Sequence, residues 1–376
     1  MNGNITASVR PITSLLDTEK YWRSTELLAN GSFFQSWNWV GAWLELLPVE
    51  SRPKLFILEN KSRTIGVGIV IQKKISRRKI INSNCLFLNE SGIPDLDALT
   101  IEHNGILTEK SQDKTTCVNN MISTICRDMP DWDEFIISGI SGENITDYLN
   151  AAYENNLKVK MLDTKPYFYV DLDEIRASGK DYISCLSSNT RQQLRRTIKA
   201  YGGLDALSIC QVTDVDEALH FYEKMKKLHQ PYWQAKGYSG AFSDHNRDEF
   251  HKNLIVTGIP DGSVQLLKIS TNKIDIGYLY NFVKGGVVYN YQGGFLYQDK
   301  PIFRPGMISH YMAIQYNINN CLNIYDFLAG DHRYKKSLST VEGEMYWFTL
   351  QKSKLIFKIE ESLQKLSCLF RTKSKN

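Results

Sequence analysis

The sequence predicts an α/β (α+β) protein built from two mixed-sheet domains in tandem, and three observations support this fold class. The chain has 376 residues, about twice the usual length of one domain. Its 42% hydrophobic and 23% charged residues are typical of globular proteins rather than disordered ones. Two similar hairpin sequences end in Ile65-Gly66 and Ile276-Gly277, and a helix and one short strand follow each of them. Two diverged copies of one unit explain this order, and chance similarity is the alternative.

The first copy opens with an aromatic helix and continues with strands. Apolar residues recur at intervals of three and four from Phe33 to Leu47, which predicts a helix that Pro48 ends. The next segments predict a hairpin, a strand, a helix, a strand and a helix. These lie at Lys54–Glu59 with Thr64–Gln72, then Cys85–Leu88, Asp113–Met129, Glu134–Gly139 and Ile145–Asn155.

The second copy repeats this order. A helix is predicted at Asp214–His229, and we expect Pro231 to stop it because proline cannot continue a helical hydrogen-bond ladder. The later elements are predicted at Asp244–Val256, Ser263–Ser270, Ile276–Val283, Val287–Gln292, Gly306–Asn319 and Ile324–Leu328. The predicted domains are residues 1–165 and 166–351, followed by a basic tail at 352–376.

Charge and cysteine usage narrow the class of protein. The net charge is +4, and the tail carries the excess of basic residues, so the body gives no reason to expect a nucleic-acid partner. We expect a cytoplasmic protein, since no signal peptide or membrane-spanning run is recognisable and the seven cysteines are scattered. His245 and His251 are spaced six apart and do not form a metal pair on a helix, so no metal is expected.

The tail has the pattern of an amphipathic helix. Apolar residues recur at helical spacing from Lys354 to Phe370, with lysines at the margins of the apolar face. This helix either docks on the body or contacts the anionic inner face of a membrane, where lipid-linked precursors would be found.

Five motifs in the second half occur together and carry a family resemblance. They are Leu186–Arg196, Leu228–Trp233, Tyr289–Gly294, Arg304-Pro-Gly306, and Tyr325–Asp331 with Tyr334-Lys335 just after it. This set resembles the CelD/BcsL family of GNAT-type acyltransferases, which is similar to the Fem aminoacyl transferases in having two GNAT-like halves. The resemblance implies acyl transfer from acetyl-CoA or another acyl-CoA to an amine or hydroxyl, on a sugar or another precursor of the envelope or of polysaccharide.

The resemblance also implies where acyl-CoA would bind. Pantetheine would lie along the strand that contains Tyr289 and Tyr291, and pyrophosphate would lie at the helix start formed by Arg304, Gly306 and Met307. A helix start offers unpaired N–H groups and a partial positive charge to an anion. The sequence has one glycine where the usual GNAT loop has two, and a plain helix start after a turn is the alternative.

Three residues are candidates for proton transfer. Asp331 follows a predicted strand and would act as base, while Tyr334 would protonate the leaving thiolate. The alternative is a capping aspartate with a packing tyrosine. His229, at the end of its helix, is either a base or a helix-capping residue.

The remaining candidates would bind the acceptor. Arg191 and Arg195 lie on one stripe of a predicted helix and would contact an anionic substrate, unless the stripe is only a solvated face. Gln230, Trp233 and Lys335 complete the predicted substrate site. Two other functions stay open. One is a Fem-type transferase that uses aminoacyl-tRNA, and the other is a non-catalytic GNAT-like scaffold that binds a biosynthetic partner.

Overall fold

The computed structural model describes residues 5–77, 81–355, 357, 359 and 360. Two compact units are present. Unit 1 comprises Met1–Asn30, Leu47–Thr164 and Tyr346–Asn376, and unit 2 comprises Gly31–Leu46 and Lys165–Met345. Strands β7 (Lys158–Asp171) and β13 (Val341–Gln351) each contribute residues to both units. The predicted tail helix falls mostly at 361–370 and therefore lies outside the described residues.

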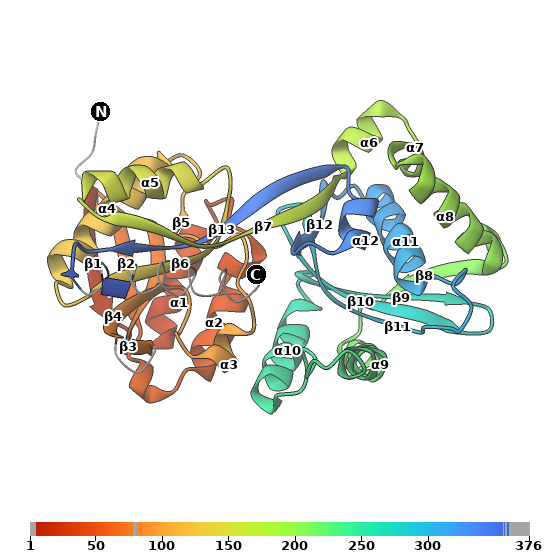
Figure 1. Ribbon diagram of the computed structural model, residues 1–376, viewed down its shortest axis with the longest axis horizontal. Helices are drawn as coiled ribbons and strands as arrows, with labels where there is room; N and C mark the ends of the chain where they lie inside the picture. Colours follow the sequence, from red (N-terminus) through yellow and green to blue (C-terminus); the bar gives the residue numbers. More distant parts are fainter. Residues whose placement is uncertain (1–4, 78–80, 356, 358, 361–376) are drawn as a thin grey trace, which may run out of the picture. The chain divides into compact units, whose positions relative to one another are not determined.

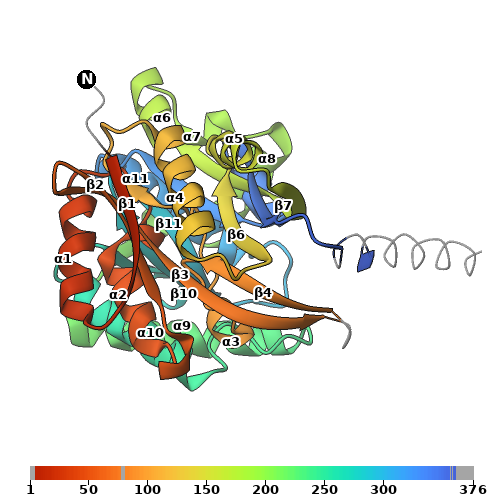
Figure 2. The same cartoon turned by 90° about the vertical axis from the view of Figure 1, so that its left-hand side faces the viewer.

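Unit 1 is a mixed sheet in the order β1-β2-β3-β4-β6, continued by β13 and β7. Its first strands are antiparallel, and β4 and β6 are parallel. Helices α4 and α5 cover one face of this sheet (Figure 2) and bury their apolar residues against it. The elements are β1 (Ile5–Pro11), α1 (Leu15–Glu26), β2 (Lys54–Asn60), β3 (Arg63–Arg77), β4 (Ile81–Leu88), α3 (Pro94–Asp97), β5 (Leu107–Thr108), α4 (Lys114–Asp128), β6 (Glu134–Ser141) and α5 (Ile145–Glu154).

Unit 2 repeats this design with the order β7-β12-β11-β10-β9-β8. Strands β8 to β11 are antiparallel neighbours, whereas β11 and β12 are parallel. Helices α9 and α10 lie on one face of this sheet and α8 and α11 on the other (Figure 1). The strands are β8 (Leu207–Gln211), β9 (Val264–Thr271), β10 (Asp275–Lys284), β11 (Val287–Phe295) and β12 (Ile324–Ala329). The helices are α2 (Trp37–Leu46), α6 (Leu172–Ser178), α7 (Tyr182–Cys185), α8 (Ser188–Ala200), α9 (Val215–Gln234), α10 (His245–Gly258), α11 (Pro305–Asn319) and α12 (Arg333–Leu338).

The shared order confirms the predicted class, a pair of mixed α/β domains. In each unit an antiparallel hairpin is followed by a further strand and a helix, and then by a strand parallel to the one before the helix. Parallel neighbours need such a crossover, which explains why a helix stands between them. The predicted hairpins correspond to β2–β3 and β9–β10.

One sequence prediction about a helix end was wrong. Pro231 was expected to stop the helix, but α9 continues to Gln234. Proline removes one hydrogen bond, but the helix continues past it, and the N–H of the C-cap residue Ala235 donates to the Pro231 carbonyl at 3.0 Å. Aromatic contacts of Tyr232 and Trp233 hold this last turn in place.

Candidate functional site

The parallel strands β11 and β12 are paired over only a short stretch. Their register joins Val287–Tyr289 to Ile324–Asp326, and β11 then continues to Phe295 and β12 to Ala329 outside this register. The pair is therefore closed at one end and open towards the carboxyl ends of both strands.

Irregular backbone accompanies this opening on both strands. The pairing of β10 with β11 shifts register next to Tyr291, and the pairing of β12 with β7 shifts register between Asp326 and Ala329. Leu328 has a left-handed φ of 63°, and its N–H donates to the Asp326 carboxylate at 2.7 Å. A non-glycine residue at positive φ is uncommon, so the surrounding contacts must hold this bend.

The start of α11 follows the open end of β11. Arg304 is the N-cap residue, makes no side-chain capping bond and is exposed, and Pro305 occupies the first turn. The N–H groups of Gly306 and Met307 have no partner inside the helix, as at any helix start. A Cβ at Gly306 would stand 3.5 Å from the Phe295 ring, so the backbone here is not crowded. This donor set fits an anion such as a pyrophosphate.

A buried lysine binds the backbone at the end of β12. Lys335 is 7% exposed, and its ammonium donates to the carbonyls of Leu328 and Ala329 at 3.2 and 2.7 Å. Gly330 follows at a positive φ of 121°. Asp331, the predicted base, comes next and is exposed. The lysine therefore holds the bent strand end that positions Asp331.

Tyr334 lies on α12 and stacks on His310 of α11. The two rings are 5.3 Å apart and inclined by 13°, and His310 Nδ1 lies 3.1 Å from the Tyr325 hydroxyl. Burial lowers the pKa of His310 to about 3, and the charge of Lys335 adds to this, so the imidazole is neutral. Although Tyr334 is 41% exposed, protein atoms crowd its hydroxyl and this desolvation raises its pKa, with Tyr232 adding to the effect.

His229 lies on α9 against the open part of β11. Its Nδ1 is 3.0 Å from the Gly293 carbonyl, which assigns the proton to Nδ1 and leaves Nε2 as an acceptor. Burial lowers its pKa, and the bond to Gly293 opposes this only in part. Trp233 packs beside it with ring centroids 5.9 Å apart. Gln230 instead bonds to the Ser239 carbonyl and to the Phe242 N–H, so its amide holds the loop after α9.

The side chains of Tyr289 and Tyr291 point away from the α11 face of the sheet. Both rings lie beside Phe34, which belongs to the segment 31–46 that packs in unit 2. Trp39 of α2 also contacts Tyr291, at 6.0 Å between centroids. The two tyrosines thus form part of an aromatic core, and a ligand along β11 would meet the strand's backbone.

The cations of the predicted basic stripe have different surroundings. The Arg191 guanidinium donates to the carbonyls of Ser184 and Leu186 at 3.1 and 2.9 Å, which ties α8 to the preceding turn. Arg195 and Lys199 are exposed on the same helix. Arg195 is therefore better placed than Arg191 to meet an anion in solution.

Residues that the sequence analysis did not single out complete this end of unit 2. Lys236 donates to the Tyr232 hydroxyl at 2.6 Å, and Tyr297 stacks on Tyr232 at 4.5 Å between ring centroids. The spacing of Tyr232 and Lys236 by four residues signals their contact if the helix is continued past Pro231. No sequence pattern indicates the partnership with Tyr297 or the stacking of His310.

The equivalent place in unit 1 is filled by its own chain. Strands β4 and β6 also pair over three positions, Cys85–Phe87 with Glu134–Ile136. Beyond them Asn104, which is 3% exposed, donates from its side chain to the Leu88 carbonyl at 3.0 Å and from its backbone to the Gly139 carbonyl at 2.9 Å. One residue thus bridges the two strands at the point where unit 2 stays open.

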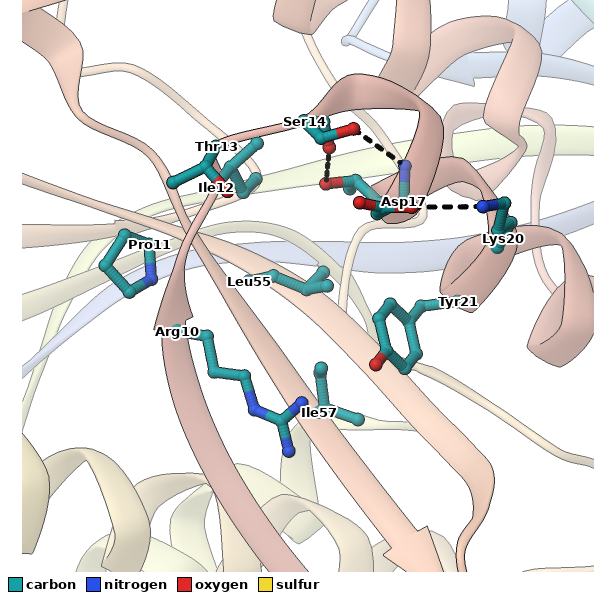
Figure 3. Close-up of a pocket in the computed structure, with 11 residues that line it drawn as sticks. Arg10, Pro11, Ile12, Thr13, Ser14, Asp17, Lys20, Tyr21, Leu55 and Ile57 are labelled. Atoms are coloured by element: carbon teal, nitrogen blue, oxygen red, sulfur yellow. Dashed lines mark hydrogen bonds and ion pairs between the residues drawn. The ribbon is translucent and has the colours of Figure 1, made fainter.

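A separate cavity of about 310 Å³ lies in unit 1 beside the start of α1 (Figure 3). Its two cations already have partners, Arg10 with Glu59 at 3.6 Å and Lys20 with Asp17 at 3.1 Å. It is lined by residues of β1, β2, α1 and the turn before α1, and no residue of β4 or β6 contributes to it. It therefore does not correspond to the open strand pair of unit 2.

The open strand pair lies within the part of the chain that is similar to a known family. Residues 188–336 match the family model described as an acetyltransferase (GNAT) domain. These residues include α8 to α11, β8 to β12 and the start of α12, and thus the whole open strand pair.

Solved structures share the fold over nearly the full length of the chain. The crystal structure of FemX has a TM-score of 0.61 at 11% identity and covers 94% of this chain and 99% of its own. The C-terminal domain of a putative lysylphosphatidylglycerol synthetase from Agrobacterium fabrum has a TM-score of 0.52 at 10% identity, covering 90% and 93%. L-PGS from Bacillus licheniformis has a TM-score of 0.51 at 10% identity, covering 89% and 92%. No curated protein matches the sequence.

Among the described residues, no helix is long and apolar enough to cross a membrane. Across the same part of the chain, no three His, Cys, Asp or Glu side chains come together as a metal-binding group.

Proposed function

We propose that the protein transfers an acyl group from acyl-CoA to an amine or hydroxyl of a sugar or another envelope or polysaccharide precursor, as the CelD/BcsL resemblance implies. The observation that carries this proposal is the open end of β11 and β12 beside the start of α11. In the GNAT fold a strand edge of this kind takes pantetheine, and the following helix start takes pyrophosphate. Here the N–H groups of Gly306 and Met307, with Arg304, would hold the phosphates.

Tyr334 is the proposed acid of this reaction. When the acceptor attacks the thioester carbonyl, the C–S bond breaks and the CoA thiolate needs a proton. The hydroxyl of Tyr334 has a raised pKa and is therefore protonated at neutral pH. Asp331 and His229 are two candidates for the group that takes the proton that the acceptor loses. Asp331 follows β12 and is exposed, while Nε2 of His229 is available as an acceptor.

A Fem-type transferase that uses aminoacyl-tRNA is the second candidate. Two observations favour it: the similarity to FemX and to the synthetase domains, and the exposed cations Arg195 and Lys199 on α8. A polyanionic donor would bind such cations and respond strongly to salt. Peripheral membrane contact through the tail remains a proposal in either case.

Calorimetric titration of the full chain with acetyl-CoA tests the main proposal. Gly306→Glu places a side chain and a negative charge where the pyrophosphate would lie, and we expect at least a tenfold loss of affinity. Gly306→Ala is the matched control, because its Cβ meets only the Phe295 ring at an ordinary 3.5 Å. Equal affinity in folded Gly306→Glu would overturn this placement. A wild-type chain that ignores acetyl-CoA but accepts aminoacyl groups from tRNA would favour the second candidate.

A further inference from the structure

A pair of tyrosines and one lysine form a compact polar group at the end of α9. The ammonium of Lys236 donates to the Tyr232 hydroxyl oxygen at 2.6 Å and lies 4.2 Å from the centre of the Tyr232 ring. The ring of Tyr297 stacks on that of Tyr232, with centroids 4.5 Å apart and an interplanar angle of 10°. The stacked rings place the Tyr297 hydroxyl near that of Tyr232, and the two groups interact electrostatically. The oxygen of Tyr232 therefore accepts a hydrogen bond from a cation and has a second phenol beside it.

These partners favour opposite protonation states in the two tyrosines. Burial alone would raise the pKa of Tyr232, but the hydrogen bond from Lys236 and the neighbouring hydroxyl of Tyr297 lower it below its usual value. Burial and the neighbouring Tyr232 raise the pKa of Tyr297. Neighbouring groups whose pKa values are pushed apart in this way are suited to separate acid and base roles.

The group stands at the open end of the strand pair. Tyr297 follows Phe295, the last residue of β11, and the Phe295 ring is 5.9 Å from that of His310. Tyr334 interacts electrostatically with both Tyr232 and Tyr297. Lys236 in turn interacts with His332 at the start of α12. The charged and titratable groups that face Tyr232 are thus Lys236 in the turn after α9, Tyr297 after β11 and Tyr334 on α12.

We propose that Tyr232, held by Lys236 and Tyr297, is the base that takes the proton from the acyl acceptor. This inference rests on the proposed acyl transfer. The acceptor's N–H or O–H attacks the thioester carbon, a C–N or C–O bond forms, and the C–S bond breaks. The acceptor's proton goes to the phenolate oxygen of Tyr232, and the proton of Tyr334 goes to the CoA thiolate. Tyr232 then loses its proton to solvent and Tyr334 takes one up from solvent, which restores both groups, so the products are the acylated acceptor and free CoA.

The ionisation of Tyr232 can be measured without any substrate. In the full chain labelled with ζ-¹³C tyrosine, the resonance lost in Tyr232→Phe identifies this residue in a pH titration by NMR. We expect it to ionise below the usual tyrosine pKa of about 10, and to ionise at higher pH in Lys236→Met. Tyr238→Phe is the matched control, because Tyr238 is 62% exposed and lies beside the same helix end. A Tyr232 resonance that titrates at or above the ordinary pH would overturn the proposal.

Turnover of acetyl-CoA with an amine or sugar acceptor tests the catalytic role. We expect Tyr232→Phe to lower kcat by about 10²-fold or more, and Lys236→Met to move the acidic limb of the kcat/KM profile to higher pH. Lys236→Arg should restore most of that shift. If the wild type turns over acetyl-CoA and both Tyr232→Phe and Lys236→Met have the same rates and pH profiles as the wild type, Tyr232 is not the base. A wild-type chain with no acyl-CoA turnover would instead contradict the proposed function, and the NMR titration would then decide about Tyr232 alone.

Discussion

The stability of unit 2 should depend on pH through His310. Burial holds its pKa at about 3 in the folded protein, against an ordinary value of 6.5. Because the unfolded chain binds this proton more readily, acid favours unfolding. The stabilisation is complete above about pH 6.5, and it is lost progressively as pH falls towards 3.

The size of the effect follows from these two values. One pKa unit corresponds to about 1.4 kcal/mol. The free energy of unfolding should therefore fall by about 2 kcal/mol between pH 7 and pH 5 because of His310 alone. His251 is also buried, and its pKa is lowered to about 3, so it adds a loss of the same sign. Glu90 in unit 1 has a pKa raised to about 8, chiefly by burial, and acts in the opposite direction. These other contributions are common to the wild type and to variants at position 310, and they cancel in a comparison.

Urea unfolding at pH 7 and pH 5 isolates the contribution of His310. His310→Phe keeps an aromatic ring under Tyr334 and removes the titrating group, so its free energy of unfolding should fall by about 2 kcal/mol less than that of the wild type. Tyr325→Phe is the control, since it removes the hydrogen bond to His310 but keeps the imidazole. The reasoning is refuted if His310→Phe and the wild type lose equal stability between the two pH values.

Two further predictions concern the contact of α9 with β11 and the proton donors. A Cβ at Gly294 would lie 2.2 Å from the Met225 carbonyl oxygen of α9, so Gly294→Ala should lower the free energy of unfolding by about 1–3 kcal/mol or more. Gly306→Ala is the control and should leave the free energy of unfolding unchanged. If the two variants are equally stable, α9 moves away from β11 without cost and the prediction is wrong. Tyr334→Phe should lower kcat by about 10²–10⁴-fold with little change in Tm, and lost Tm with normal kcat would make the residue structural. A comparable loss of kcat in Asp331→Asn would assign the base to Asp331 and contradict the role of Tyr232.

The elements of this fold could be predicted because each is encoded locally. The periodicity of two and of 3.6 locates the hairpins and the long helices, and the repeated order of elements indicates two similar units. Asp113 and Asp214 cap α4 and α9, where the sequence placed the helix starts. Tyr334 and Lys335, which the motifs around β12 singled out, lie on α12, the helix that follows this strand.

What the sequence could not indicate are the partners of these elements. The aromatic segment from Phe33 to Leu47 has the pattern of a helix, but any apolar surface could bury the apolar face of such a helix. In the structure Phe33 stacks on Phe282 of β10, at 4.1 Å between ring centroids, and Asn38 donates to Asp261 at 2.9 Å. These contacts join positions more than two hundred residues apart, and no local signal specifies them.

The contrast between the two units argues for placing acyl transfer in unit 2. In unit 1, Asn89 and Asn104 form a buried amide pair whose donors and acceptors are satisfied by Ile69, Leu88 and Gly139. Opening that strand pair would leave several of these buried polar groups without partners, each at a cost of about 1–3 kcal/mol. In unit 2 the corresponding carbonyls at the strand ends bond instead to His229 from α9 and to Lys335 from α12, which are side chains able to carry protons. The two units thus differ at this place: unit 1 closes its strand pair, whereas unit 2 positions ionisable groups beside an open strand edge.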